Sequence, residues 1–181
     1  MKLPMKTMTD RIIALGADKV QHTGKTYLAH AIGVYQLMKS WGEDDEMCRA
    51  AMFHSIYGTE GFQDFTLPLE QRDAMREFIG DRAEWLAYVN SAMKRDTFYC
   101  QVALVRDKYP ITDRLNGDTM QLNDQEFQDL MRLHLCDMLE QVERDNVWDS
   151  QRETFRQMAE RIGGAALECY DAVFAREPLQ V

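Results

Sequence analysis

Apolar residues recur every three or four positions over most of the chain, which is the spacing of one face of an α-helix. A clear case is the series Tyr27, His30, Val34, Leu37 and Trp41. Seven segments have this pattern and are predicted to be helices: residues 9–20, 26–41, 46–57, 69–80, 81–94, 123–143 and 150–175.

Residues that favour helix ends mark the first boundaries. Thr9 or Asp10 is expected to cap the first helix, which should end near Gly16. Asp44 or Asp45 is expected to cap the third helix, because a short acidic side chain can accept the free N–H groups of a first turn.

Later boundaries are marked in the same way. Gly80 separates the fourth predicted helix from the fifth. Asn123, followed three residues later by Glu126, has the spacing of a capping box. The last helix is expected to bend at the pair Gly163 and Gly164, because glycine is a weak helix former.

One segment differs from the helical pattern. The stretch "YPITDRLNGDTMQL" has alternating residues on both sides of Asn-Gly, the strongest short signal for a β-hairpin. The predicted fold is therefore an all-α bundle of about seven helices, with one small β-hairpin near residues 111–122. A chain of 181 residues suits a single domain, so we assign residues 1–181 to one unit.

Composition restricts the class of partner. The formal net charge is −9, and an acidic surface repels phosphate backbones, so we expect no nucleic-acid partner. No apolar run approaches the length of a membrane span, and the first residues do not resemble a signal peptide. The four cysteines are scattered and are expected to be reduced thiols. We expect a cytoplasmic protein that binds a small molecule and no membrane.

The stretch "HTGKTYLAH" contains Gly-Lys-Thr, the end of a phosphate-binding loop. That loop also requires a glycine five residues earlier, where this chain has Lys19, and a preceding buried strand. The nucleotide-binding interpretation is therefore rejected. Gly24 and Thr26 are instead expected to form a turn and a helix cap.

The histidines and one aspartate are the candidates for chemistry. His30 and His54 lie on apolar faces of successive predicted helices, where each is either a hydrogen-bonded core residue or a ligand. His134 and Asp137 are three residues apart on a later helix. Asp137 has apolar neighbours, so it is either exposed beside Gln141 or bound to a positive partner.

The segments "HTGKTYLAH", "AAMFHS" and "LCDMLEQ", in this order, resemble the HD-domain superfamily. They are most similar to the hydrolase domain of (p)ppGpp synthetase/hydrolases. The family motif Arg-Lys-Ser-Gly-x-Pro-Tyr-x-x-His is matched at Gly24, Tyr27 and His30. The resemblance covers about residues 12–142, and "HS-x-YGT" is shared with a family of small HD-like proteins.

The resemblance implies a divalent metal ion held by His30, His54 and Asp137. The aspartate of the HD pair is replaced by Ser55. The family's Glu-Asp pair is replaced by Gly58 and Thr59.

The family's nucleotide-contacting Arg and Lys are replaced as well. Gln21 and His22 occupy their positions. Hydrolysis of (p)ppGpp is therefore not expected.

The chemistry expected from these residues is metal-dependent hydrolysis of a small phosphorylated or polar metabolite. Two histidines and one carboxylate suit one ion of Mn, Fe or Zn. Glu60 or His22 is the expected base. The expected substrate-binding residues are Lys25, Ser55, Tyr57, Thr59, Arg72 and Gln141. Two alternatives remain at this point: a metal-free binding or interaction protein with a degenerate HD site, and an HD-type iron oxygenase.

Overall fold

The computed structural model describes residues 3–22, 24–145 and 148–178, and this part of the chain is mostly helical. Its helices are α1 (Met5–Ala14), α2 (Tyr27–Ser40), α3 (Asp45–Met52), α4 (Arg72–Ile79), α5 (Asp81–Ala92), α6 (Arg95–Tyr99), α7 (Asp124–Asp145), α8 (Arg152–Ile162) and α9 (Gly164–Phe174). A short 3-10 turn, Leu69–Gln71, precedes α4.

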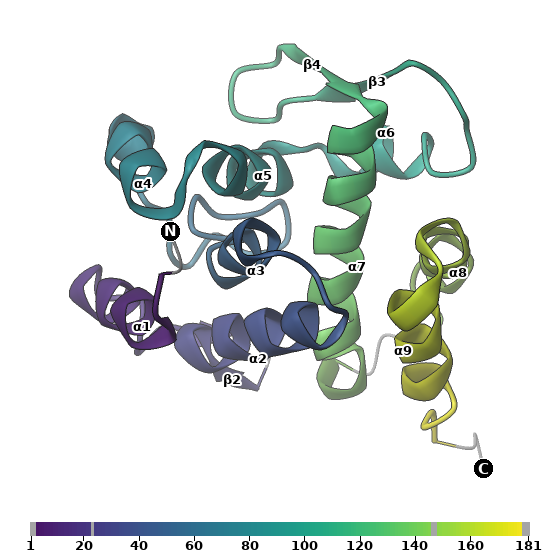
Figure 1. Cartoon of the computed structure of the whole chain (residues 1–181), viewed down its shortest axis with the longest axis horizontal. Coiled ribbons are helices and arrows are strands. Elements are labelled where there is room, and N and C mark those ends of the chain that lie inside the picture. Colours follow the sequence, from purple (N-terminus) through teal and green to yellow (C-terminus); the bar gives the residue numbers. More distant parts are fainter. Residues whose placement is uncertain (1–2, 23, 146–147, 179–181) are drawn as a thin grey trace.

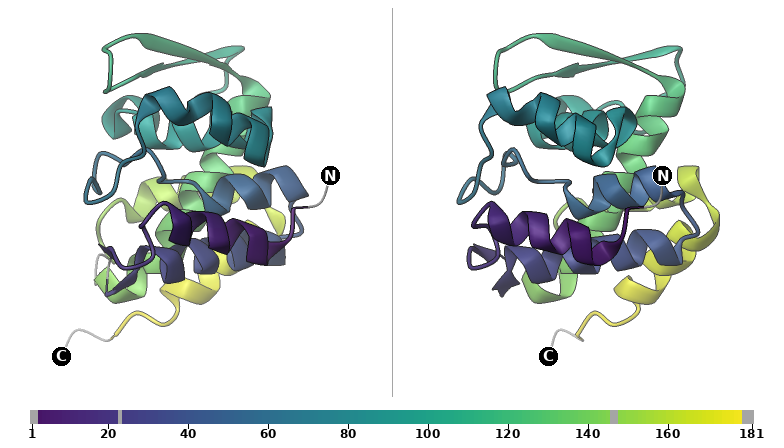
Figure 2. Two further views of the ribbon diagram at one scale, coloured as in Figure 1. Left: turned by 90° about the vertical axis from the view of Figure 1, so that its left-hand side faces the viewer. Right: turned by 60° about the vertical axis from the view of Figure 1, so that its left-hand side comes forward.

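The longest helix, α7, is the centre of the arrangement. It contacts α2, α3 and α5 on one side and α8 and α9 on the other (Figure 1). The side views show the hairpin of β3 and β4 at one end, α4 and α5 next to it, and α1 and α2 at the opposite end (Figure 2). Because α7 is contacted on both sides, its buried residues include polar ones, among them Asp129, His134, Asp137 and Gln141, as well as apolar ones.

Two antiparallel sheets of two strands complete the fold. Strands β3 (Lys108–Thr112) and β4 (Thr119–Asn123) form the predicted hairpin, and Gly117 of the Asn-Gly pair has a φ of 82°. Strands β1 (Gln21–His22) and β2 (Lys25–Thr26) form a second hairpin that was not predicted. Each of these strands has only two residues, too few to show an alternating pattern.

The predicted caps of α3 and α7 are confirmed. The Asp44 carboxylate accepts the N–H groups of Glu46 and Met47 at 2.9 and 2.8 Å. Asn123 and Glu126 form a reciprocal capping box, with bonds of 3.0 and 2.8 Å.

Thr26 caps α2 as predicted. Its hydroxyl accepts the N–H of Ala29 at 3.2 Å. The break between α4 and α5 at Gly80 is also confirmed.

Two predicted boundaries are wrong. The first helix begins at Met5 and not at Thr9 or Asp10, because Met8 and Ile12 are both fully buried and extend its apolar face by one turn. The last segment is two helices, α8 and α9, and not one bent helix. Gly163, with φ 72° and ψ −167°, ends the first of them.

Two further differences concern the middle of the chain. The helix predicted over residues 46–57 ends at Met52, so His54 lies in the turn that follows α3. The short helix α6 was not predicted.

None of the helices in the described ranges is long and apolar enough to span a membrane.

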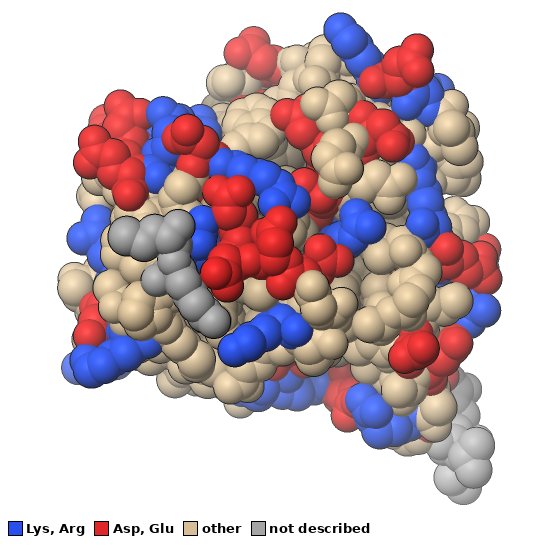
Figure 3. Space-filling view, in the orientation of Figure 1, with Lys and Arg blue, Asp and Glu red and all other residues tan. Residues whose placement is uncertain are grey.

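Charges of both signs are mixed on the face shown in Figure 3, and acidic side chains gather near its centre. Separately, the first turn of α3 contains the acidic residues Asp45 and Glu46, and the cap residue Asp44 pairs with Arg82 at 2.7 Å. Acidic groups at this helix start are favourable because the amino end of a helix carries partial positive charge.

Candidate metal centre

Three helical elements bring His30, His54 and Asp137 together in the interior. His30 lies in the first turn of α2, His54 follows α3 directly, and Asp137 lies in the middle of α7. Their exposed fractions are 0%, 1% and 3%. Of the two alternatives for Asp137, the exposed position beside Gln141 is therefore wrong.

The reactive atoms of the three residues form a small triangle. Asp137 Oδ1 lies 3.1 Å from His30 Nε2 and 3.3 Å from His54 Nε2. The two Nε2 atoms are 3.2 Å apart. This triad is a group of the right kind to hold a metal ion, and the predicted convergence of the three side chains is confirmed.

The other nitrogen of each ring identifies its tautomer. His54 Nδ1 lies 2.9 Å from the carbonyl oxygen of Ala51, which can only accept a hydrogen bond. His30 Nδ1 lies 2.6 Å from Oε2 of Glu140. Both Nδ1 atoms must therefore carry hydrogen, and in the neutral rings both Nε2 lone pairs point toward Asp137 Oδ1.

The electrostatics of the triad follow from this crowding of acceptors. Burial alone would lower the pKa of His30, but hydrogen bonds to Asp137 and Glu140 raise it to about 9. Burial opposes ionisation of Asp137, but both histidines hold the pKa of this carboxyl well below its usual range. Three acceptors this close require a cation between them, either a proton on His30 or a metal ion.

Glu140 supports the triad from behind. Its carboxylate accepts hydrogen bonds from Lys25 at 2.8 Å and from Arg144 at 2.6 Å. Although burial opposes it, hydrogen bonds from His30, Arg144 and Lys25 lower the pKa of Glu140 to about 2. A Cβ at Gly33 would collide with this carboxylate, so glycine at that position lets Glu140 reach His30.

A cavity of about 300 Å³ opens onto the triad. Its wall is formed by Gln21, His22, His54, Ser55, Thr59, Gly61, Phe62, Asp64, Arg95, Asp137, Met138, Gln141 and Asp145. It is not the largest hollow, because a groove between α5 and α7 that includes Trp85 has about 380 Å³.

Besides the predicted ligands His54 and Asp137, four of the residues predicted as base or substrate-binding residues line this cavity. They are His22, Ser55, Thr59 and Gln141. Gln141 donates to Asp137 Oδ1 at 3.0 Å, and the Thr59 hydroxyl accepts the N–H of Phe62 at 3.1 Å.

Four predicted residues lie off the cavity wall. Lys25 holds Glu140, and Glu60 accepts the backbone N–H of Arg95 at 3.0 Å. Tyr57 and Arg72 both bind the carboxylate of Glu84, which lies outside this wall.

His22 is placed against the triad. Its ring stacks on His30 with centroids 4.2 Å apart and an angle of 7° between planes. Burial, together with the nearby His30, lowers the pKa of His22 to about 4, so the ring is neutral at neutral pH.

His134 does not join the triad. It is fully buried, and its Nε2 lies 2.9 Å from the Tyr99 hydroxyl. Burial lowers the pKa of His134 to about 3, so this residue is a neutral core histidine.

Two buried hydroxyls near the cavity lack hydrogen bonds of ordinary geometry within the described ranges, those of Ser55 and Tyr27. Burial raises the pKa of Tyr27, and the neighbouring Ser55 hydroxyl partly offsets the rise.

Sequence reasoning missed four residues of the site: Glu140, Arg95, Asp64 and Asp145. Glu140 lies three residues after Asp137, hence on the same helix face, and that spacing was a usable signal. Asp145 lies eight residues after Asp137 on the same helix, a second usable spacing, and Asp64 lies in the loop that follows His54. Arg95 lies in α6, far along the chain from the motifs, and no local pattern points to it.

A family model described as "Domain of unknown function (DUF6817)" matches residues 11–95. The match includes His30, His54 and Arg95 but ends before Asp137. Neither the search of curated proteins nor the search of solved structures found a match.

Proposed function

We propose that this protein is an HD-like hydrolase that holds one divalent metal ion with His30, His54 and Asp137. The observation that carries the proposal is the convergence of three acceptor atoms, one from each of these side chains. The Nδ1–H groups of His30 and His54 bind Glu140 and the Ala51 carbonyl, so in the neutral rings each Nε2 atom has a free lone pair. Histidine ligands of metals commonly donate their other N–H to a carboxylate or a carbonyl in this way.

The spacing of the three atoms suits a metal ion. Metal–ligand bonds of about 2.0–2.2 Å place neighbouring ligand atoms roughly 3–3.6 Å apart. The separations in the triad are 3.1, 3.2 and 3.3 Å. Two histidines and one carboxylate leave open positions and suit Fe, Mn or Zn.

The HD-like assignment rests on the order of the ligands and on their helices. A histidine in one helix, a second histidine after the next and a late aspartate follow the HD arrangement, with Ser55 in place of the HD aspartate. Ser55 contributes no negative charge, so we expect a weaker metal site than one with a fourth anionic ligand.

The pocket favours a small polar substrate. A volume of about 300 Å³ is at the lower end of the range for small-molecule sites. A bound divalent cation would supply Lewis acidity and acidify a water molecule. His22 lines the pocket as a neutral ring, and its lowered pKa of about 4 makes it a weak base there.

The test is a hydrolysis screen of small phosphate esters and other polar esters, with and without Mn(II), on wild type and His54→Ala. We expect turnover that needs Mn(II) and is abolished by the substitution. Metal-independent turnover, or the same turnover in both proteins, would contradict the proposal.

A metal-free binding protein is the second candidate, and a specific observation favours it. Asp137 already accepts a hydrogen bond from Gln141, and a proton on His30 can balance the triad without metal. In that case a ligand should stabilise His54→Ala and wild type equally in thermal unfolding, with no effect of Mn(II).

A further inference from the structure

The cavity wall contains a positive charge that the triad does not use. Arg95, the first residue of α6, is half-buried, and its guanidinium forms no ion pair or hydrogen bond with the rest of the described chain. Most other arginines here bind a carboxylate or a carbonyl, for example Arg82, Arg132 and Arg161. An arginine without a partner in a pocket is a candidate for binding an anion.

The backbone around Arg95 holds its side chain at the wall. The N–H of Arg95 donates to Glu60 Oε2 at 3.0 Å, which fixes the start of α6. Across from it, a Cβ at Gly61 would lie 3.3 Å from Nη1 of Arg95 and 3.6 Å from Nη2. Glycine at this position therefore lets the guanidinium rest against the loop backbone.

Two buried polar atoms on the same wall also lack partners. Ser55 Oγ and His22 Nδ1 have no hydrogen bond of ordinary geometry within the parts of the chain that are described, and the Tyr27 hydroxyl beside Ser55 is also buried and lacks such a bond. The exposed fractions of Ser55 and His22 are 1% and 8%. Buried polar groups are almost always hydrogen-bonded, so unpaired ones that face a cavity are available to bind a ligand or a water molecule there.

The charges of the wall are consistent with an anion bound next to a metal ion. Asp64, Asp137 and Asp145 are its acidic members, and Arg95 is its one cation among the residues described. A divalent ion at the triad together with Arg95 would balance these three carboxylates. An anionic ligand is then no longer repelled.

We propose that Arg95, with Ser55 and His22, forms a subsite for an oxyanion group of the substrate, a phosphoryl or carboxylate group, beside the metal triad. The assignment as a substrate subsite rests on the function proposed above. It names Arg95 as the residue that selects anionic substrates and Gly61 as the residue that positions it.

The experiment is calorimetric titration of inorganic phosphate, and separately of acetate, into protein with and without Mn(II). The variants are Arg95→Ala, Gly61→Ala and the matched control Arg106→Ala, which removes the same charge from an exposed residue off the cavity wall. Binding of Mn(II) is measured in each variant, and circular dichroism confirms that each one is folded.

We expect Arg95→Ala to weaken phosphate binding by about tenfold or more, since charge-assisted hydrogen bonds are the strong ones. Gly61→Ala should weaken it less, because the charge remains but is displaced, and Arg106→Ala should have no effect. Arg95-dependent binding that is tighter for phosphate identifies a phosphoryl subsite, and binding that is tighter for acetate identifies a carboxylate subsite.

Phosphate and acetate affinities of Arg95→Ala within about twofold of wild type would overturn the subsite, as would a wild type that binds neither anion. If Mn(II) binds but the binding of neither anion depends on Arg95, the subsite proposal fails and the metal-centre proposal stands. If the anions depend on Arg95 but Mn(II) does not bind, the metal-centre proposal fails.

Discussion

Two of the buried charged clusters in the described part of the chain are built on opposite principles. In the first, the fully buried Glu84 of α5 accepts hydrogen bonds from Arg72 at 2.6 and 3.0 Å and from the Tyr57 hydroxyl at 3.0 Å. In the second, His30, His54 and Asp137 turn three acceptor atoms toward one another. The first cluster pairs donors with acceptors, and the second lacks a cation.

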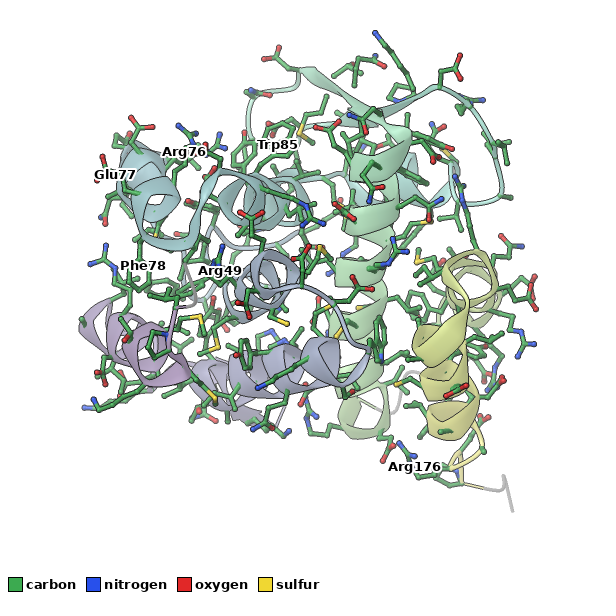
Figure 4. The ribbon with its side chains drawn as sticks, in the orientation of Figure 1. Arg49, Arg76, Glu77, Phe78, Trp85 and Arg176 are labelled. Carbon is green, nitrogen blue, oxygen red and sulfur yellow. The ribbon has the colours of Figure 1, made fainter. Side chains whose placement is uncertain are left out.

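The difference separates a structural cluster from the proposed metal site. The Glu84 cluster joins α4 and α5 to the turn that follows His54, and Arg76, which Figure 4 labels on α4, adds a second arginine 3.6 Å from Glu84. It needs nothing from outside the chain. The triad balances only when a proton or a metal ion enters, and this is the property of a binding site.

The largest effect expected is the loss of stability in Glu84→Ala. The substitution leaves the partly buried Arg72 without its carboxylate, so the free energy of unfolding in urea should fall by about 3 kcal/mol. Metal affinity should stay unchanged in the folded variant. The matched control is Glu77→Ala, on the exposed side of α4, with a change of about 0.5 kcal/mol or less. Equal losses in both variants would refute the structural role.

Asp137→Asn should have the opposite effect, a large loss of metal affinity with little loss of stability. Loss of the anionic ligand should weaken Mn(II) binding by about 100-fold or more, as measured by calorimetry. Above about pH 9, where His30 is neutral in the wild type, stability of the metal-free protein should change by about 1 kcal/mol or less, because the introduced amide can donate to a histidine Nε2. Unfolding of the variant, with a loss like that of Glu84→Ala, would show that the triad is structural.

A pH series tests the proton that a metal ion must displace. The pKa of His30 is raised from 6.5 to about 9, so its contribution to metal-free stability is full below about pH 6.5 and is lost as pH rises through about 9. Metal binding releases this proton. Mn(II) affinity should therefore rise about tenfold per pH unit below pH 9 and then level off. A flat profile between pH 6.5 and 9 would contradict the assigned protonation.

The smallest effect is expected at Lys25, which orients Glu140 from a partly exposed position. Its side chain is 38% exposed, so the ion pair with Glu140 is weak. Lys25→Ala should lower Mn(II) affinity by about two- to fivefold. Lys19→Ala, at an exposed position, is the control and should leave Mn(II) affinity unchanged. A loss as large as that of Asp137→Asn would mean that Lys25 has another role.

Local sequence signals were sufficient for much of the fold. The caps at Asp44 and Asn123, the break at Gly80 and the Asn-Gly hairpin each depend on residues within four positions of one another. The triad was also predictable, because its ligands match a known order of motifs. The start of α1 was not, since the burial of Met8 depends on distant helices.

The rest of the site could not be predicted because it is assembled by packing between segments. Arg95 reaches the cavity through the contact of α6 with the loop that carries Gly61, which is 34 residues earlier in the chain. The carboxylate of Glu60 could act as a base, but it accepts a hydrogen bond from the backbone N–H of Arg95. The identity of a side chain does not show which neighbour it will bind.

The most direct test of the metal centre is a titration of chelator-treated protein with Mn(II), on wild type and His54→Ala, with ion content measured by elemental analysis. We expect one ion per chain in wild type and a loss of affinity of about 100-fold or more in His54→Ala, with the helical content unchanged. A folded wild type that binds no ion, or the same binding in both proteins, would contradict the account.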